Sequence, residues 1–228
     1  MHPHDLWLVN AFPVDRTDSK HSPMAATFQL GEEEGLIAFL EAAQGGSHNV
    51  YFSVNPPVGR MTKKALRTDI EKMTFLHVDL DPRAGEDPDE ERVRLLELVT
   101  TRLPAGIPKP TAVVDSGGGF WAFWRLDDPF PIESSEPRYE EAKLYNLHLE
   151  TVFGADSCHN VDRIARLPGS VNYPDKKKLA KGRIERLSEV VELNPVSYKL
   201  ADFTKATQLA APTSGFSSGK TVEISENV

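Results

Sequence analysis

Two aspartates separated by one residue, at the end of a mostly apolar run, constrain this chain more than any other feature. Asp79 and Asp81 follow the β-forming residues 75–78. Alternate residues of a strand point to the same face, so both carboxylates share one face while Leu80 can enter a core on the other. Mg²⁺ and Mn²⁺ are typically held by one or two carboxylates together with substrate phosphates. The pattern therefore indicates a metal site; the alternative is a solvated strand end that Pro82 terminates.

Length and composition indicate a water-soluble protein with a sizeable core. The 228 residues suffice for one large or two small domains. No apolar stretch approaches the roughly 18 residues of a transmembrane helix, so we expect no membrane partner. The N-terminus lacks a basic segment followed by an apolar one, so we expect no signal peptide. The single Cys158 excludes an internal disulfide and favours a cytoplasmic location.

The charge is unevenly distributed along the chain. The net charge of −8 argues against a protein that coats nucleic acid through bulk charge. Residues 163–186, however, carry eight basic side chains against two acidic ones. Such a strip can attract phosphates at one place, although a solvated lysine loop would have the same composition. The nucleic-acid-binding residues predicted from this strip are Lys176, Lys177, Lys178, Lys181 and Arg183.

The order of the expected elements predicts an α+β fold in which helices pack on one face of a sheet. Residues 1–30, with three spaced prolines, are expected to be irregular, and the polar residues beyond 211 to be disordered. Apolar residues at Val93, Leu96, Val99 and Leu103 predict the buried stripe of one helix. The expected helices span residues 35–43, 90–103 and 138–153, and the expected strands span residues 49–54, 74–80, 111–115, 120–126, 163–167 and 183–190.

A glycine turn joins two of these strands. Residues 116–119 read Ser-Gly-Gly-Gly, whose backbone N–H groups could approach a phosphate closely; a flexible hairpin turn is the alternative. The strand that follows carries Trp121 and Arg125 on one face. That face could stack bases and contact phosphates, or it could lie under a helix.

Two arginines follow a pair of acidic residues further along the chain. Asp162 directly precedes Arg163, Asp156 lies six residues before Asp162, and Arg166 follows three residues after Arg163. Paired arginines near carboxylates are often structural ion pairs. They are also suited to a triphosphate, because guanidinium groups bind phosphate oxygens through two parallel hydrogen bonds.

Three runs taken together resemble the catalytic core of the archaeo-eukaryotic primase superfamily, and especially the RepB-like primases and phage primase-polymerases. These are FLHVDLDP at residues 75–82, SGGGFWAFW at 116–124, and the segment 156–172, which ends in RIARLPGSVN. The resemblance covers roughly residues 45–190 in order. It implies an RRM-like, split α/β primase core with a mixed or antiparallel sheet and flanking helices. The catalytic domain would span residues 31–210, between the irregular segment 1–30 and a disordered tail or linker at 211–228.

The resemblance also implies roles for individual residues. Asp79 and Asp81 would bind catalytic Mg²⁺ or Mn²⁺ together with a third acid, either Asp156 or, alternatively, Asp162. One position departs from the pattern, because the superfamily usually has a histidine where this chain has Trp121. An indole donates one hydrogen bond but carries no charge, so phosphate binding there is weaker, differently arranged or compensated by Arg125, or else catalysis has been lost. The implied nucleotide-binding residues are Ser116, Gly117, Gly118, Trp121, Arg163, Arg166 and Asn172.

The function that this resemblance implies is template-dependent nucleotidyl transfer. A DNA primase or primase-polymerase would use two divalent metals to join dNTPs or NTPs on a single-stranded DNA template. It would act in the replication of a phage or mobile element, and in the host cytoplasm if a phage encodes it. A replicative helicase, fused or encoded nearby, would be a further partner. One alternative is a non-catalytic single-stranded-DNA-binding or replication-initiator module with a degenerate primase fold. A metal-dependent phosphodiesterase is another, although the paired arginines suit a triphosphate better.

Overall fold

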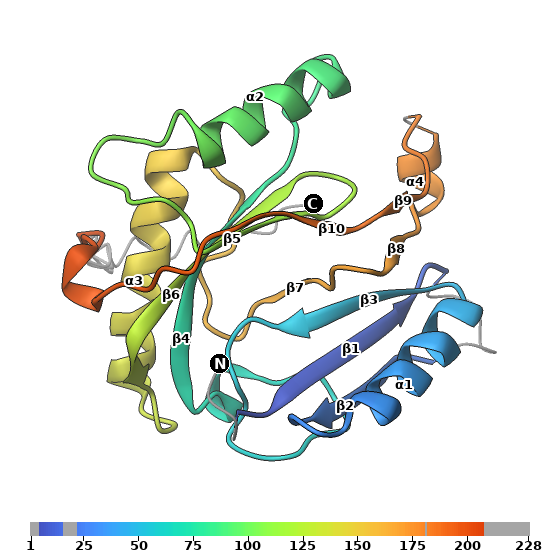
Figure 1. Cartoon of the computed structure of the whole chain (residues 1–228), viewed down its shortest axis with the longest axis horizontal. Coiled ribbons are helices and arrows are strands. Elements are labelled where there is room, and N and C mark those ends of the chain that lie inside the picture. The colour runs from blue at the N-terminus through green and yellow to red at the C-terminus, as the bar shows by residue number, and fades with distance from the viewer. Residues whose placement is uncertain (1–4, 16–21, 181, 208–228) are drawn as a thin grey trace, which may run out of the picture.

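Two four-stranded antiparallel sheets form the framework of the protein, and their inner faces are turned toward each other (Figure 1). The computed structural model describes residues 5–15, 22–180 and 182–207. The first sheet has the order β2 (Met24–Phe28), β1 (Trp7–Pro13), β3 (His48–Ser53), β7 (Ile164–Arg166). The second has the order β10 (Glu189–Leu193), β5 (Ala112–Asp115), β6 (Phe120–Pro131), β4 (Lys72–Leu80). Two short strands, β8 (Val171–Asn172) and β9 (Arg186–Leu187), pair separately.

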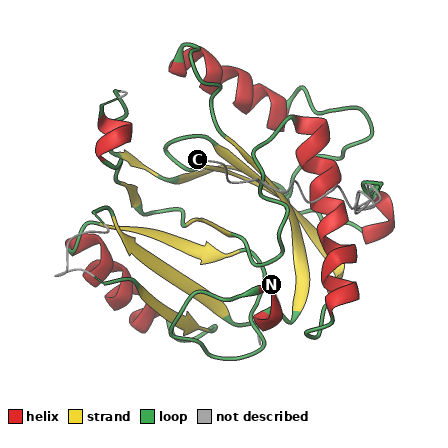
Figure 2. Cartoon of the chain, turned by 180° about the vertical axis from the view of Figure 1, so that it is seen from behind, coloured by secondary structure: helices red, strands yellow, loops and turns green. Residues whose placement is uncertain are grey.

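Helices cover the outer face of each sheet (Figure 2). Helix α1 (Glu33–Gly45) packs on β2 and β3, and α3 (Glu136–Phe153) packs on β4. Helix α2 (Pro88–Thr100) lies against the second sheet, whereas the short α4 (Lys176–Leu179) is exposed. Two 3₁₀ turns complete the elements, η1 (Arg67–Asp69) and η2 (Leu200–Asp202). No helix in the described part of the chain is both long and apolar enough to cross a membrane.

The prediction that residues 1–30 are irregular is wrong. Strand β1 lies inside the first sheet, where it pairs with both β2 and β3. Pro13 is the last residue of β1, and Pro23 directly precedes β2. The prolines therefore mark the ends of strands, where a missing N–H costs little, and a domain boundary at residue 31 would cut through the sheet. The tail at 211–228 lies outside the described residues.

The buried face of α2 also differs from the predicted apolar stripe. Val93 is 60% exposed and Leu96 is 36% exposed, while Leu95 and Val99 are buried. Glu91 extends the buried row by one turn and is 2% exposed. Residues four apart share a helix face, so the true face begins with a charged residue. A search for apolar periodicity alone cannot find such a face.

Strand β6 is buried on both faces. Phe120, Ala122 and Trp124 belong to the large core between the second sheet and helices α2 and α3. On the opposite face, Trp121 and Phe123 are each 4% exposed, and they pack with residues of β3 and β7. The face proposed for base stacking is therefore mainly the contact between the two sheets.

One buried asparagine fixes a bulge in β4. The pairing of β4 with β6 shifts register between Met73 and Phe75. Asn55 accepts hydrogen bonds at Oδ1 from the N–H groups of Thr74 (2.8 Å) and Phe75 (3.1 Å), and its Nδ2 donates to the carbonyl of Val161 (3.0 Å). This fully buried side chain thus satisfies backbone groups that the bulge leaves unpaired.

We predict that Asn55→Ala lowers the free energy of unfolding by about 3 kcal/mol, because it leaves three backbone groups of the interior without partners. Urea denaturation checks this value. Gln29→Ala, at an exposed position after β2, is the control and should change stability by less than about 0.5 kcal/mol. Equal effects of the two substitutions would contradict the role of Asn55.

Candidate active site

A cavity of about 510 Å³ opens between the two sheets and is lined by both acidic and basic residues. Asp79 and Asp81 supply the acidic side chains from the end of β4. Phe12 and Tyr51 reach it from the first sheet, and Trp121 from the second. The basic residues of its lining are Lys64, Arg163, Arg166, Lys178 and Arg183.

The strand that carries the aspartates alternates as the sequence predicts. Val78 and Leu80 are buried in the core, while Asp79 is half-buried and Asp81 is exposed. Both carboxylates face the cavity. Burial, and then the negative charges of Asp81 and Asp156, raise the pKa of Asp79 to about 7. This part of the cavity therefore concentrates negative charge in a place with restricted solvent.

The structure separates the two candidates for a third acid. The N–H of Asp156 donates to the carbonyl of Asp79 (3.0 Å), and burial followed by the charge of Asp81 raises the pKa of Asp156. Asp162 instead lies 3.8 Å from the ammonium group of Lys64, and it raises the pKa of Tyr139, an effect second to burial. Asp156 is thus the acid beside Asp79 and Asp81.

The chemistry of these carboxylates fits a divalent cation that is shared with a substrate. The charges of Asp81 and Asp156 raise the pKa of Asp79, and the charge of Asp81 raises that of Asp156; a cation would offset this repulsion. Within the described residues, no three His, Cys, Asp or Glu side chains lie close enough to form a complete metal cluster. Mg²⁺ and Mn²⁺ commonly take their remaining ligands from water and substrate phosphates. The carboxylates therefore fit either ion as a partial ligand set.

Arg166 lines the same cavity, and two of its donors have no partner among the described residues. It is 6% exposed, and its Nη2 donates to the hydroxyl of Tyr51 (3.1 Å) and to Oδ1 of Asn172 (2.8 Å). Its Nε and Nη1 are buried and have no hydrogen-bond partner. Burial lowers the pKa of Arg166, but a guanidinium stays protonated in proteins. A buried cation with two free donors is suited to bind an anion such as phosphate.

Arg163 shares the cavity with Arg166 although they are three residues apart. Arg163 precedes β7 and lies in a turn, where its N–H donates to the carbonyl of Asn160 (3.2 Å). The alternation of strand residues therefore does not apply to it. No bulge is needed to bring the two guanidinium groups to one cavity.

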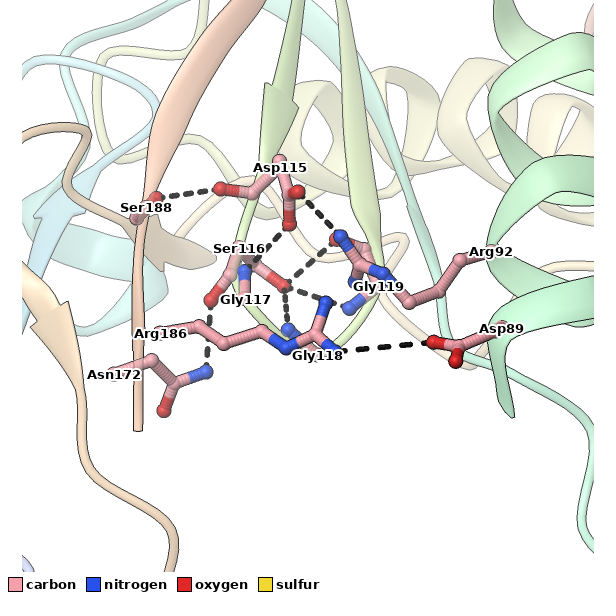
Figure 3. A network of polar contacts seen from close by, with 10 residues as sticks. All are labelled: Asp89, Arg92, Asp115, Ser116, Gly117, Gly118, Gly119, Asn172, Arg186 and Ser188. Atoms are coloured by element: carbon pink, nitrogen blue, oxygen red, sulfur yellow. Dashed lines mark hydrogen bonds and ion pairs between the residues drawn. The ribbon is translucent and has the colours of Figure 1, made fainter. Parts of the chain in front are cut away.

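The glycine turn at residues 116–119 is closed by its own hydrogen bonds (Figure 3). Oγ of Ser116 accepts from the N–H groups of Gly118 (3.3 Å) and Gly119 (3.0 Å). The N–H of Gly117 donates to Oδ1 of Asp115 (2.7 Å), and the N–H of Ser116 donates to the carbonyl of Gly119 (2.9 Å). All four N–H groups already have partners, which argues against a backbone cradle for phosphate.

Glycine is needed in this turn because other segments pack directly against it. A Cβ at Gly119 would lie 2.0 Å from the carbonyl oxygen of Leu80 and 2.8 Å from Oδ1 of Asp81. A Cβ at Gly118 would lie 2.7 Å from Nη1 of Arg183. The turn therefore fixes the position of Asp81 through close contact.

Asn172 links the glycine turn to Arg166. Its Nδ2 donates to the carbonyl of Ser116 (2.7 Å), and its Oδ1 accepts from Nη2 of Arg166 (2.8 Å). The side chain lines the cavity, but its amide already makes both of these bonds. Asn172 thus connects two elements that were predicted to bind the nucleotide.

The predicted nucleic-acid-binding residues divide into two groups. Lys178 and Arg183 line the cavity. Lys176 and Lys177 are exposed on α4 and are not part of the lining. Lys181 lies outside the described residues.

Trp121 occupies the histidine position of the resembled family and packs between other rings. Its ring lies 5.8 Å from that of Phe123, nearly parallel, and 5.8 Å from that of His77. Arg125 pairs with Phe75 along the strand and does not line the cavity. The suggested compensation by Arg125 therefore has no support, and the basic side chains of the cavity come from other elements.

Sequence reasoning missed His77, which is fully buried two residues before Asp79. Burial lowers its pKa to about 4, so the ring is neutral near pH 7. Its Nε2 lies 2.9 Å from the carbonyl of Cys158 and donates to it. His77 thereby ties the segment that carries Asp156 to β4. Also missed as cavity-lining residues were Phe12, Tyr51, Lys64 and Ile164, of which Tyr51 and Ile164 stood in predicted strands.

A replication protein of Clostridium perfringens is 29% identical to this chain over 144 residues, which are 61% of this chain and 33% of that protein. The chain thus spans about a third of the length of this relative. No protein-family profile matches the sequence.

Solved primase structures share the fold. The primase-polymerase domain of cyanophage S-2L superposes with a TM-score of 0.57 at 16% identity, over 86% of this chain and 85% of that chain. Primase RepB′ gives a TM-score of 0.51 at 13% identity, over 86% of this chain and 54% of that chain. Its catalytic domain in complex with initiator DNA gives 0.50 at 14% identity, over 86% and 80%. The chain therefore has the α+β fold of archaeo-eukaryotic primase domains, which confirms the predicted fold class.

We predict that Gly119→Ala destabilises the protein by about 1–3 kcal/mol, because the added methyl group must push Leu80 and Asp81 aside. Thermal unfolding measures the loss. Gly59→Ala is the matched control, since a Cβ at Gly59 meets no atom within 4 Å. A Gly119→Ala variant as stable as Gly59→Ala would contradict the close packing.

A second prediction concerns pH. The pKa of Asp79 rises from its ordinary 3.8 to about 7 in the fold. At this side chain the folded state therefore binds more protons than the unfolded state, so the contribution of Asp79 to stability falls as pH rises from 4 to 8. In metal-free buffer, the wild type should lose on the order of 2–4 kcal/mol relative to Asp79→Asn over this range. Urea denaturation of both proteins at several pH values checks this, and a pH-independent difference between them would contradict it.

Proposed function

We propose that this protein is a template-dependent nucleotidyltransferase of the primase-polymerase type. The observation that carries the proposal is the cavity itself, which is lined by two carboxylates and five basic side chains. Among the basic side chains, Arg166 has two buried donors without partners in the described part of the chain. The phosphates of a nucleoside triphosphate would suit the basic side chains, and the cation bound to it would suit the carboxylates.

The basic side chains of the cavity would bind the triphosphate. Arg166 would contact phosphate oxygens through Nε and Nη1, with its plane held by Tyr51, whose ring lies 4.3 Å from the guanidinium carbon. Arg163 and Lys178 would neutralise further phosphate charge from other sides of the cavity. Such fixed charges stabilise a transferring phosphoryl group without having to reorganise during the reaction.

The carboxylates would face the reacting atoms. Asp79 and Asp81 would hold Mg²⁺ or Mn²⁺, at one or two positions, together with Asp156, which lies beside Asp79 although it does not line the cavity. The ion would activate the 3′-hydroxyl of the growing strand and neutralise charge on the phosphates. Asp79 contributes from a half-buried position, while Asp81 is held in place by Gly119. The chain's own task is thus to position the hydroxyl and the α-phosphate for in-line attack, with pyrophosphate as the leaving group.

A single-stranded DNA template is the partner that best suits this reaction. The structure of the RepB′ catalytic domain with initiator DNA supports DNA as a ligand of this fold. Lys176 and Lys177 lie exposed on α4, outside the cavity, where they could contact a template backbone. A replicative helicase, fused or encoded nearby, would provide the single-stranded DNA.

We predict that the Asp79→Ala/Asp81→Ala double variant loses incorporation of labelled nucleotides on a single-stranded template by roughly 10³-fold or more, because the reacting hydroxyl is no longer activated. Assays with and without a primer, in Mg²⁺ or Mn²⁺, measure this. Asp156→Ala should be similarly impaired, whereas Asp162→Ala, the matched control, should stay active.

Robust synthesis by the double variant would refute nucleotidyl transfer at this site. A wild-type protein that binds single-stranded DNA without metal and incorporates nothing would favour the non-catalytic initiator module. Metal-dependent cleavage of DNA without synthesis would identify a phosphodiesterase instead.

A further inference from the structure

The first turns of α2 carry charged side chains that contact three separate segments around the cavity. Glu91 contacts the chain just after Asp81, and Arg92 contacts Asp115, just before the glycine turn. Asp89 lies 3.8 Å from Arg186 of β9. Neither Glu91 nor Arg92 lines the cavity, so their contacts act on the site only through other residues.

Glu91 holds the backbone that follows Asp81. Its Oε2 accepts from the N–H of Arg83 (2.9 Å), and its Oε1 accepts from Nη2 (2.6 Å) and Nε (3.1 Å) of the same residue. Arg94 donates to both oxygens as well, at 2.6 and 2.8 Å. The Glu91 side chain is 3% exposed, so this carboxylate is buried with its charge compensated on two sides. Hydrogen bonds from two guanidinium groups to both oxygens of a buried carboxylate give the group a defined geometry.

Arg92 holds the glycine turn from the same helix (Figure 3). Its Nη2 contacts Oδ2 of Asp115, while Oδ1 of Asp115 accepts from the N–H of Gly117 (2.7 Å). The Arg92 guanidinium also lies over the ring of Phe120, 5.1 Å from its centre. The carboxylate of Asp115 therefore links Arg92 of α2 to the backbone of the turn.

We infer that α2 is a positioning helix, in which Glu91 and Arg92 set the distance between Asp81 and the glycine turn. The two segments meet where a Cβ on Gly119 would lie 2.0 Å from the carbonyl oxygen of Leu80, so the contact tolerates little displacement. Adjacent residues on one helix fix both sides of this contact. The inference rests on the proposed function, because a metal-binding Asp81 is what needs the precision.

The consequence for catalysis is specific. A displacement of about 1 Å in a catalytic group can cost roughly 10²-fold in rate. Arg92→Ala frees Asp115 and the turn but leaves the apolar face of α2, Leu95 and Val99, intact. Arg92→Lys keeps a charge that can still reach Asp115, although it lacks the planar fork. A positioning role therefore predicts partial rescue by lysine.

The test compares Arg92→Ala, Arg92→Lys and Glu91→Gln with the wild type. Glu97→Gln is the control, because Glu97 lies on the same helix and forms an exposed ion pair with Arg102, which follows the end of the helix. Three quantities are measured: amide hydrogen exchange at residues 80–83 and 116–119, Mn²⁺ affinity by electron paramagnetic resonance, and nucleotide incorporation as a function of Mn²⁺ concentration. Circular dichroism melts identify any variant that fails to fold, in which case Arg92→Lys alone decides.

Arg92→Ala should speed amide exchange in the turn at least tenfold, weaken Mn²⁺ binding several-fold and lower incorporation by 10- to 100-fold. Arg92→Lys should recover part of each, and Glu97→Gln should match the wild type. Unchanged exchange and Mn²⁺ affinity in both Arg92→Ala and Glu91→Gln would overturn the inference. Exchange and Mn²⁺ binding need no nucleotide, so they judge α2 even if the wild type incorporates nothing, a result that would refute only the proposed function.

Discussion

The antiparallel pairing of β4 with β6 is the constraint on which the rest of the site depends. It places Asp79 opposite Trp121 and Leu80 opposite Phe120, so the aspartates end beside the glycine turn. The contact is so close that only glycine fits at position 119. Two runs about 40 residues apart in sequence become one wall of the cavity, and the bulge held by Asn55 sets the register in which they meet.

The cavity receives its acidic and its basic side chains from different elements of this framework. The second sheet contributes the acids, whereas β7 and the segments around it contribute Arg163 and Arg166. The first sheet adds Tyr51, which orients the buried guanidinium. Each set of side chains on its own is electrostatically unfavourable, since Asp79 resists ionisation and Arg166 has unpaired donors. A ligand that carries both a cation and phosphates would satisfy the two sets at once.

Local patterns in the sequence predicted most elements and the shared face of Asp79 and Asp81. The strand alternation at Asp79 and Asp81 placed both carboxylates correctly, because it depends only on period-two geometry. The structural role of residues 116–119 could not be predicted from the sequence, because it depends on which N–H groups form hydrogen bonds within the turn itself. Strand β1 was missed because its prolines stand at strand ends, and Glu91 because a buried charge breaks an apolar stripe. Contacts such as those of Arg166 with Tyr51 join residues 115 positions apart, and no local pattern encodes them.

The central claim is that the cavity binds a nucleoside triphosphate jointly with a divalent cation. Isothermal titration of a non-hydrolysable dNTP analogue, with and without Mn²⁺, tests it most directly. The account predicts binding that is strong with Mn²⁺, at least tenfold weaker without it, and lost in Arg166→Gln. Binding of equal strength with and without the metal, or binding unaffected by Arg166→Gln, would contradict it.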